Sequence, residues 1–178
     1  MLIGLTWLSI LIYTAVVCGQ TPTLGLADGF LTFSAAPFSV QLVKDSQTLY
    51  SLKNGNFDFI PADKMTQRQY NGNVHLGDIS FRARVVGSSA WISGDTFSSR
   101  KPVRALSTSG PTLAAADLSP SLPSNSLLNI TRRWVFQNNT LQVLFDVTNS
   151  RANSVEIGAL GAPLEFNNVT YSFLEHCI

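Results

Sequence analysis

Apolar and polar residues alternate along much of this chain, in runs separated by short clusters of glycine, asparagine and serine. A period of two is the spacing at which side chains share one face of a β-strand, so the pattern is typical of strands with one buried and one solvated face. Segments with helical spacing are few. The sequence therefore predicts an all-β fold, an antiparallel β-sandwich that buries the apolar faces.

The segments that fit the strand pattern are 30–33, 38–43, 47–52, 74–86, 127–136, 141–147 and 155–160. In the segment 74–86 the alternation predicts one apolar face formed by Ile79, Phe81, Ala83 and Val85. Two stretches, 54–73 and 87–123, lack the pattern and are predicted to be long loops of the kind that is often functional. Within the second loop, residues 114–117 fit either a strand or a single helical turn.

The N-terminus predicts a secretory signal peptide. Residues 1–20 contain no charged side chain, and the apolar run Leu2–Val17 precedes the small residue Gly19. This run is shorter than the roughly 20 residues of a membrane-spanning helix, and no Lys or Arg cluster follows it. We therefore expect a signal helix over 1–19, a secreted protein without stable membrane insertion, and a sandwich domain over 20–168. A retained membrane anchor and a buried N-terminal helix are the alternatives.

Three glycosylation sequons agree with secretion, at Asn129, Asn138 and Asn168. Asn129 lies in an apolar run, so an inward orientation is also open. Removal of Cys18 with the signal peptide leaves Cys177 without an internal partner. An intermolecular disulfide, or a partner from residues outside this chain, is the expectation for Cys177.

Charge and motif content exclude several functional classes. The 12 basic and 11 acidic side chains leave a net charge of +1, so no bulk field attracts nucleic acid or an anionic membrane. The histidines, His75 and His176, are far apart in sequence, and no carboxylates have calcium-loop spacing, so no metal site is predicted. The chain has neither a phosphate loop nor a Gly-x-Ser-x-Gly motif. No cofactor is predicted.

Five short motifs occur in order along the chain: FDFIP (57–61), HLGDISFR (75–82), ADLSP (116–120), ITRRW (130–134) and VEIGALGAP (155–163). Together they resemble the N-terminal part of a family of large secreted proteins, common in fungi, whose function is unknown. The resemblance covers about residues 24–168, and the tail 169–178 departs from it.

The resemblance implies a sandwich of the galactose-mutarotase-like supersandwich type, which precedes a helical (α/α)₆ toroid as in many glycoside hydrolases and polysaccharide lyases. It also implies that the catalytic carboxylates come mainly from the toroid, which is missing here. We therefore expect a truncated chain, a non-catalytic scaffold or weak glycan binder. Its expected partners are a polysaccharide or glycan and the missing toroid.

Asp78 and Asp117 are the candidate catalytic carboxylates if the domain acts alone as a glycosidase or lyase. Glycoside hydrolysis requires two carboxyl groups about 5 to 9.5 Å apart, which sequence cannot place. Asp78 lies close to His75 and can share a hydrogen bond with it. Each aspartate also has a structural interpretation, Asp78 as a residue that fixes the entry of a strand and Asp117 as a turn residue.

Trp91, Tyr70 and Arg133 are the candidates for carbohydrate binding. A flat aromatic ring packs against the C–H face of a pyranose, and Trp and Tyr add a donor at the rim. Trp91 lies among serines and is the first choice, but it also fits a residue that plugs the sandwich end or meets the toroid. Because neighbouring strand residues face opposite ways, Trp134 is predicted to be core and Arg133 exposed.

A third function stays open beside the glycan-binding module and the stand-alone enzyme. An exposed apolar face, bare where the toroid is expected, predicts a structural or interaction protein.

Overall fold

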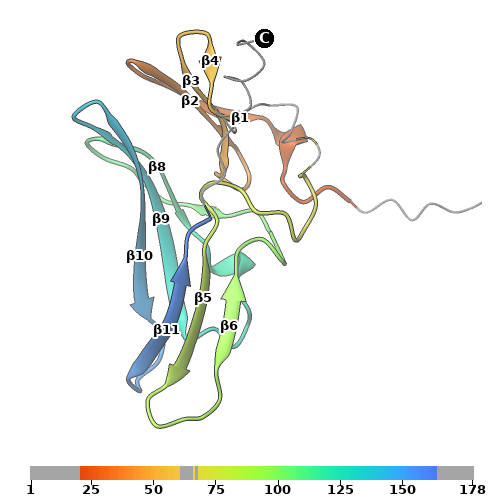
Figure 1. Ribbon diagram of the computed structural model, residues 1–178, viewed down its shortest axis with the longest axis vertical. Coiled ribbons are helices and arrows are strands. Elements are labelled where there is room, and N and C mark those ends of the chain that lie inside the picture. Colours follow the sequence, from red (N-terminus) through yellow and green to blue (C-terminus); the bar gives the residue numbers. More distant parts are fainter. Residues whose placement is uncertain (1–20, 61–65, 67, 164–178) are drawn as a thin grey trace, which may run out of the picture.

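The computed structural model describes residues 21–60, 66 and 68–163, and this part of the chain is all-β with three antiparallel sheets (Figure 1). In spatial order, the first sheet contains β1 (Phe30–Ala35), β2 (Phe38–Val43), β3 (Leu49–Asn54) and β4 (Phe57–Asp58). The second contains β10 (Thr140–Asn149), β9 (Leu128–Gln137), β8 (Thr112–Asp117) and β7 (Arg104–Ala105). The third contains β11 (Val155–Gly161), β5 (Ser80–Val85) and β6 (Ile92–Asp95). Two short 3₁₀ helices, η1 (Leu26–Asp28) and η2 (Ser119–Ser121), complete the described elements.

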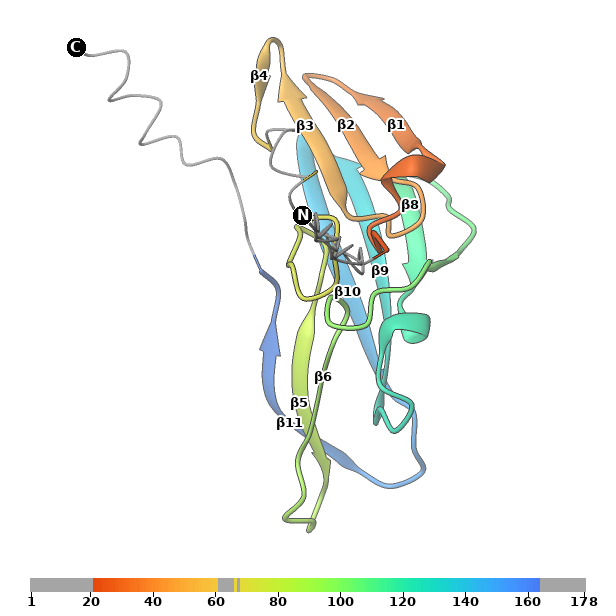
Figure 2. The same ribbon diagram turned by 90° about the vertical axis from the view of Figure 1, so that its right-hand side faces the viewer.

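The second sheet is the long one, because β9 and β10 have 10 residues each and pair from Thr140↔Gln137 to Asn149↔Leu128. Figure 1 shows β1–β4 beside the upper end of this sheet and β5, β6 and β11 beside its lower end. Figure 2, turned by 90°, shows the same separation of the two smaller sheets along the vertical axis. The predicted antiparallel sandwich is confirmed, and its inner face is divided between two small sheets.

Each half of this inner face has its own apolar core. Trp134 of β9 packs in a cluster with Val40, Leu42 and Leu49 from the first sheet. Ile130 of β9 packs in a second cluster with residues such as Phe81 from the third sheet. The side chain at position 132, which lies between these two positions on the same face of β9, therefore sits at the junction of the three sheets.

The strand predicted over 74–86 begins only at Ser80. Gly77 has a φ of +107°, a left-handed conformation that breaks the extended chain, and the Asp78 carboxylate accepts a hydrogen bond from the His75 backbone N–H at 2.8 Å. The predicted face is confirmed, since Ile79, Phe81 and Ala83 are buried.

The stretch 87–123, predicted to be one long loop, contains β6, β7 and β8. Residues 114–117 belong to β8, which confirms the strand alternative. Three consecutive alanines give little intrinsic strand preference, and β8 is a strand because it pairs with β9, for example Ala116 with Arg132. The stretch 54–73 likewise contains β4, which pairs with the end of β3.

The predicted signal helix over 1–19, Asn168 and the tail 169–178 lie outside the described residues.

Candidate functional site

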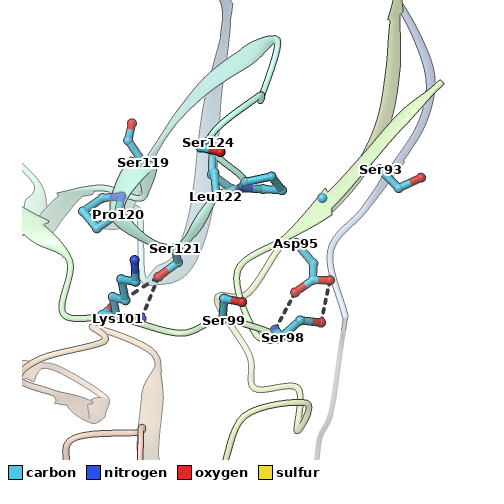
Figure 3. Close-up of a pocket in the computed structure, with 12 residues that line it drawn as sticks. Ser93, Asp95, Ser98, Ser99, Lys101, Ser119, Pro120, Ser121, Leu122 and Ser124 are labelled. Atoms are coloured by element: carbon cyan, nitrogen blue, oxygen red, sulfur yellow. Dashed lines mark hydrogen bonds between the residues drawn. The ribbon is translucent and has the colours of Figure 1, made fainter. Parts of the chain in front are cut away.

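An open cleft of about 690 Å³ lies between the end of β6 with the segment that follows it and the loop around η2 (Figure 3). Its lining residues are mostly small and polar: Ser93, Gly94, Asp95, Ser98, Ser99, Lys101, Ser119, Pro120, Ser121, Leu122, Pro123 and Ser124. We call it the serine cleft. Its volume falls within the range of small-molecule sites, about 300 to 1,000 Å³.

Hydrogen bonds fix the walls of the serine cleft. The Asp95 carboxylate accepts hydrogen bonds from the backbone N–H groups of Phe97 at 2.9 Å and Ser98 at 2.6 Å, and from the Ser98 hydroxyl at 2.8 Å. Across the cleft, the Ser121 hydroxyl accepts from the Lys101 backbone N–H at 2.9 Å and donates to the Lys101 carbonyl at 3.3 Å. Figure 3 shows the contacts between Asp95 and Ser98 and between Ser121 and Lys101. The cleft is therefore formed by the fold itself.

Several polar groups of the cleft remain available. Ser93, Ser99 and Ser124 are exposed, and among the described residues their hydroxyls have no hydrogen-bond partner. Lys101 is also exposed, and no ion pair joins its ammonium group to the described part of the chain. A serine hydroxyl is both donor and acceptor. The cleft thus offers hydroxyl groups and one cation to a polar ligand.

Trp91 lies on the outer face of the third sheet and does not line the serine cleft. The Arg82 and Arg84 guanidinium carbons are 4.6 and 4.4 Å from its ring centroid, which is cation–π distance. A Cβ at Gly158 would come within 2.6 Å of the indole, so the ring rests where β11 has no side chain. Arg84 also binds Glu156 at 2.8 Å. Trp91 is therefore half-buried and packs against both β5 and β11.

The other two predicted carbohydrate contacts lie elsewhere. Arg133 is on the outer face of the long sheet, as predicted, where it forms an ion pair with Asp146 at 2.8 Å. This hydrogen-bonded pairing lowers the pKa of Asp146. Tyr70 is half-buried in the segment before β5, where its hydroxyl is 3.5 Å from the Gln69 amide nitrogen. The structure does not bring Trp91, Tyr70 and Arg133 together in one contact set.

Asp78 and Asp117 also belong to separate contact sets, and neither lines the serine cleft. Only 2% of the Asp78 side chain is exposed, so it presents no surface to a substrate. Asp117 accepts hydrogen bonds from the Ser119 backbone N–H at 2.9 Å and hydroxyl at 2.6 Å, and lies 3.3 Å from Arg104. This geometry agrees with the structural interpretation of both residues, strand entry for Asp78 and turn for Asp117.

A buried polar cluster, which we call the junction cluster, occupies the meeting point of the three sheets and was not predicted. Asp78 binds Arg100 at 2.6 Å and accepts from the Thr96 hydroxyl at 2.8 Å. Arg132 donates to the carbonyl of Gly77 and, at 2.5 Å, to that of Ser46. Arg132 shares its strand face with Trp134 and Ile130, and this period-two placement was the signal in the sequence.

His75 lies in the same cluster and is also buried. Its Nε2 is 2.8 Å from the Arg68 carbonyl. Burial and the nearby Arg100 guanidinium lower the pKa of His75 to about 4, so the ring is neutral at physiological pH. The described residues contain no group of three or more His, Cys, Asp or Glu side chains placed to hold a metal ion.

Two of the three predicted glycosylation sites can be placed. Asn129 is exposed on the outer face of β9, and Asn138 is exposed in the β9–β10 turn with a φ of +52°. The outward orientation resolves the alternative left open for Asn129. Asn138 and Asn139 both have positive φ, as type I′ hairpin turns require.

Apolar side chains are exposed along β11, the edge strand of the third sheet. Ile157 is 47% exposed and Leu160 is 52% exposed. Each pairs with a residue whose side chain is buried, Ile157 with Ala83 and Leu160 with Phe81. The apolar face of the third sheet therefore continues onto an edge strand whose apolar side chains the described residues leave exposed.

These observations define an all-β, sandwich-like domain with a hydroxyl-lined cleft. In comparison with known proteins, a family model described as "Family of unknown function (DUF5695)" matches residues 41–173. Because this match covers most of the chain, the protein belongs to that family. No curated protein and no solved structure matches the chain. None of the described helices has the length and apolar character that crossing a membrane requires.

Proposed function

We propose that this domain is the non-catalytic β-sandwich module of a secreted, carbohydrate-active protein, and that its serine cleft binds a glycan. The observation that carries the proposal is a preformed cleft in which half of the lining residues are serines. Sugar hydroxyls need partners that both donate and accept, and serine hydroxyls do so at little cost in side-chain entropy.

The carboxylate content of the cleft favours binding over hydrolysis. Among the described residues that line the cleft Asp95 is the one carboxylate, and its oxygens already accept three hydrogen bonds. Both mechanisms of glycoside hydrolysis described for paired carboxylates need a second one within about 9.5 Å. We therefore expect glycan binding without turnover.

Glycan arrays followed by calorimetry with the best oligosaccharide test the proposal. Replacement of two of the three available hydroxyls in Ser99→Ala/Ser124→Ala is expected to weaken binding at least fivefold, because two ligand contacts disappear. The matched control is Ser34→Ala/Ser39→Ala, two exposed serines that pair across β1 and β2. Absence of glycan binding by the parent domain, or equal loss in both double variants, would contradict the proposal.

Secretion is tested by the intact mass of the protein from a eukaryotic secretory host. We expect cleavage after Gly19 and glycans on Asn129 and Asn138, whose side chains are exposed. A medium without the protein, or a secreted chain that still carries residues 1–19, would overturn this part of the proposal.

A second candidate function is attachment of a further domain, and the exposed Ile157 and Leu160 favour it. Apolar side chains on an uncovered sheet edge promote association. In this case the domain should self-associate at high concentration, and Ile157→Lys/Leu160→Lys should make it monomeric in light scattering. A parent domain that is monomeric at high concentration would count against this function.

A further inference from the structure

A small, partly open cavity lies in the junction cluster. It has a volume of about 10 Å³, and its walls include Ser46, Asp78, Thr96, Arg100 and Arg132. A cavity of this size holds one particle about as large as a water molecule. Lys101 and Ser121 line both this cavity and the serine cleft, so the two spaces share one wall.

The walls of the cavity carry an excess of positive charge. Arg100 is 5% exposed and Arg132 is 1% exposed, and Asp78 is the one carboxylate among the described residues that line the cavity. Burial lowers the pKa of Arg132 to about 10, which still leaves it protonated at neutral pH. Two buried cations thus face one buried anion, and an uncompensated charge in the interior is costly.

The unsatisfied groups on the residues that line the cavity are all donors. Arg100 Nε, Arg100 Nη1 and Arg132 Nε are buried and have no hydrogen-bond partner in the described part of the chain. Gln47 Oε1 and His75 Nδ1 are also buried without a partner among the described residues, but these two residues do not line the cavity. The hydroxyls on the walls already have protein partners, since Ser46 binds Thr48, Thr96 donates to Asp78 and Ser121 binds Lys101. The carboxylate of Asp78 accepts three hydrogen bonds, which leaves about one acceptor site for a water molecule, but a water molecule would not balance the positive charge.

We propose that this cavity binds one monovalent anion, chloride in ordinary saline, through the N–H groups of Arg100 and Arg132. The anion accepts the free hydrogen bonds and balances the excess positive charge. Because Arg132 donates to carbonyls of two segments, at Ser46 and Gly77, the bound ion stabilises the place where the three sheets meet. This inference is independent of glycan binding.

Thermal unfolding at constant ionic strength tests the proposal, with sodium chloride exchanged stepwise for sodium gluconate, an anion too large for the cavity. Saturation of the site is expected to raise Tm by about 5 °C along a hyperbolic curve, since a ligand stabilises the state that binds it. Sodium bromide should act like chloride. Equal Tm values in chloride and gluconate would overturn the proposal.

Arg132→Met should abolish the dependence of Tm on chloride, whereas Arg133→Met, one residue away on the outer face, should retain it. Arg132→Met is expected to be much less stable, so crystals of the parent protein grown in bromide provide a measurement that does not need the variant. The proposal expects an anomalous peak within hydrogen-bond distance of Arg100 and Arg132. Density there without anomalous signal would identify a water molecule and overturn the proposal.

Discussion

Arg100 and Lys101 are neighbours in the chain but belong to two different regions of the molecule. Arg100 is 5% exposed and forms part of the junction cluster, whereas Lys101 is exposed on the wall of the serine cleft. Both regions combine serines with charged side chains. In the junction cluster Asp78, Arg100 and Arg132 bind buried groups of the protein and also leave some buried N–H groups without a partner in the described part of the chain, while in the cleft several hydroxyls are open to solvent. Burial, and not residue type, therefore separates the structural network of the junction cluster from the binding surface of the serine cleft.

Breaking the buried ion pair should have the largest effect. Asp78→Ala leaves Arg100 buried without its carboxylate, and loss of one partner of a buried pair costs about 3 to 5 kcal/mol of the free energy of unfolding. Urea unfolding measures this loss. The matched control is Asp146→Ala, which removes the exposed partner of Arg133 and should leave the midpoint unchanged within error. Equal effects of the two substitutions would refute the distinction between the regions.

A second substitution strains the junction without changing a charge. Gly77→Ala places a Cβ 2.9 Å from the Trp134 ring and 3.1 Å from Arg132 Nη1, at a φ of +107°. Overpacking and backbone strain together should cost about 2 to 4 kcal/mol in chemical denaturation. Gly87 also has a positive φ, +86°, but open space around it, so Gly87→Ala should cost only about 1 kcal/mol. A similar loss at both glycines would show that packing at the junction is loose.

Mild acid should weaken the junction through His75. Its pKa is lowered from 6.5 to about 4 in the folded state, so the unfolded chain binds the proton more readily between these values. Stability is therefore present above pH 6.5 and is lost as the pH falls toward 4. We expect a loss of about 1 kcal/mol between pH 7 and pH 5.5, measured by urea unfolding. The variant His75→Gln should show a smaller loss, and an unchanged loss would assign it to other groups.

The smallest effect on stability is expected at the serine cleft. Ser99→Ala/Ser124→Ala removes exposed hydroxyls without partners among the described residues, so the free energy of unfolding should change by no more than about 0.5 kcal/mol. Calorimetric unfolding of the variant gives this value directly. A clear loss of stability would mean that these hydroxyls support the fold. The serine cleft would then have a structural role, like the junction cluster.

The strand faces were the most predictable part of the fold. Phe81 and Ala83 are buried and Trp134 is core, as the alternation predicted, because orientation along a strand follows from a local period of two. The strands within 87–123 were less predictable. The alanines of β8 and the Ser-Gly pair of β6 carry weak preferences, and only pairing with β9 and β5 makes them strands.

The candidate site was less predictable than the fold. Trp91 was chosen for its serine-rich surroundings, but its ring packs against Arg82 and Arg84 of β5 and against Gly158 of β11, and Gly158 is distant from it in sequence. The serine cleft forms where residues 93–101 approach residues 119–124, and no motif spans both segments. Clefts of this kind depend on long-range packing. The local sequence pattern of one segment does not show which distant segment it will contact.

The sequence by itself determined the antiparallel all-β architecture and which side chains of each strand face inward, because both follow from local alternation and turn chemistry. The family is likewise a property of the sequence. Only the tertiary structure decided that two small sheets share one long sheet, that Arg132 lies at their junction and that Asp78 is buried. These features depend on contacts between residues as far apart as Ser46 and Arg132, whose proximity is set by the packing of whole sheets.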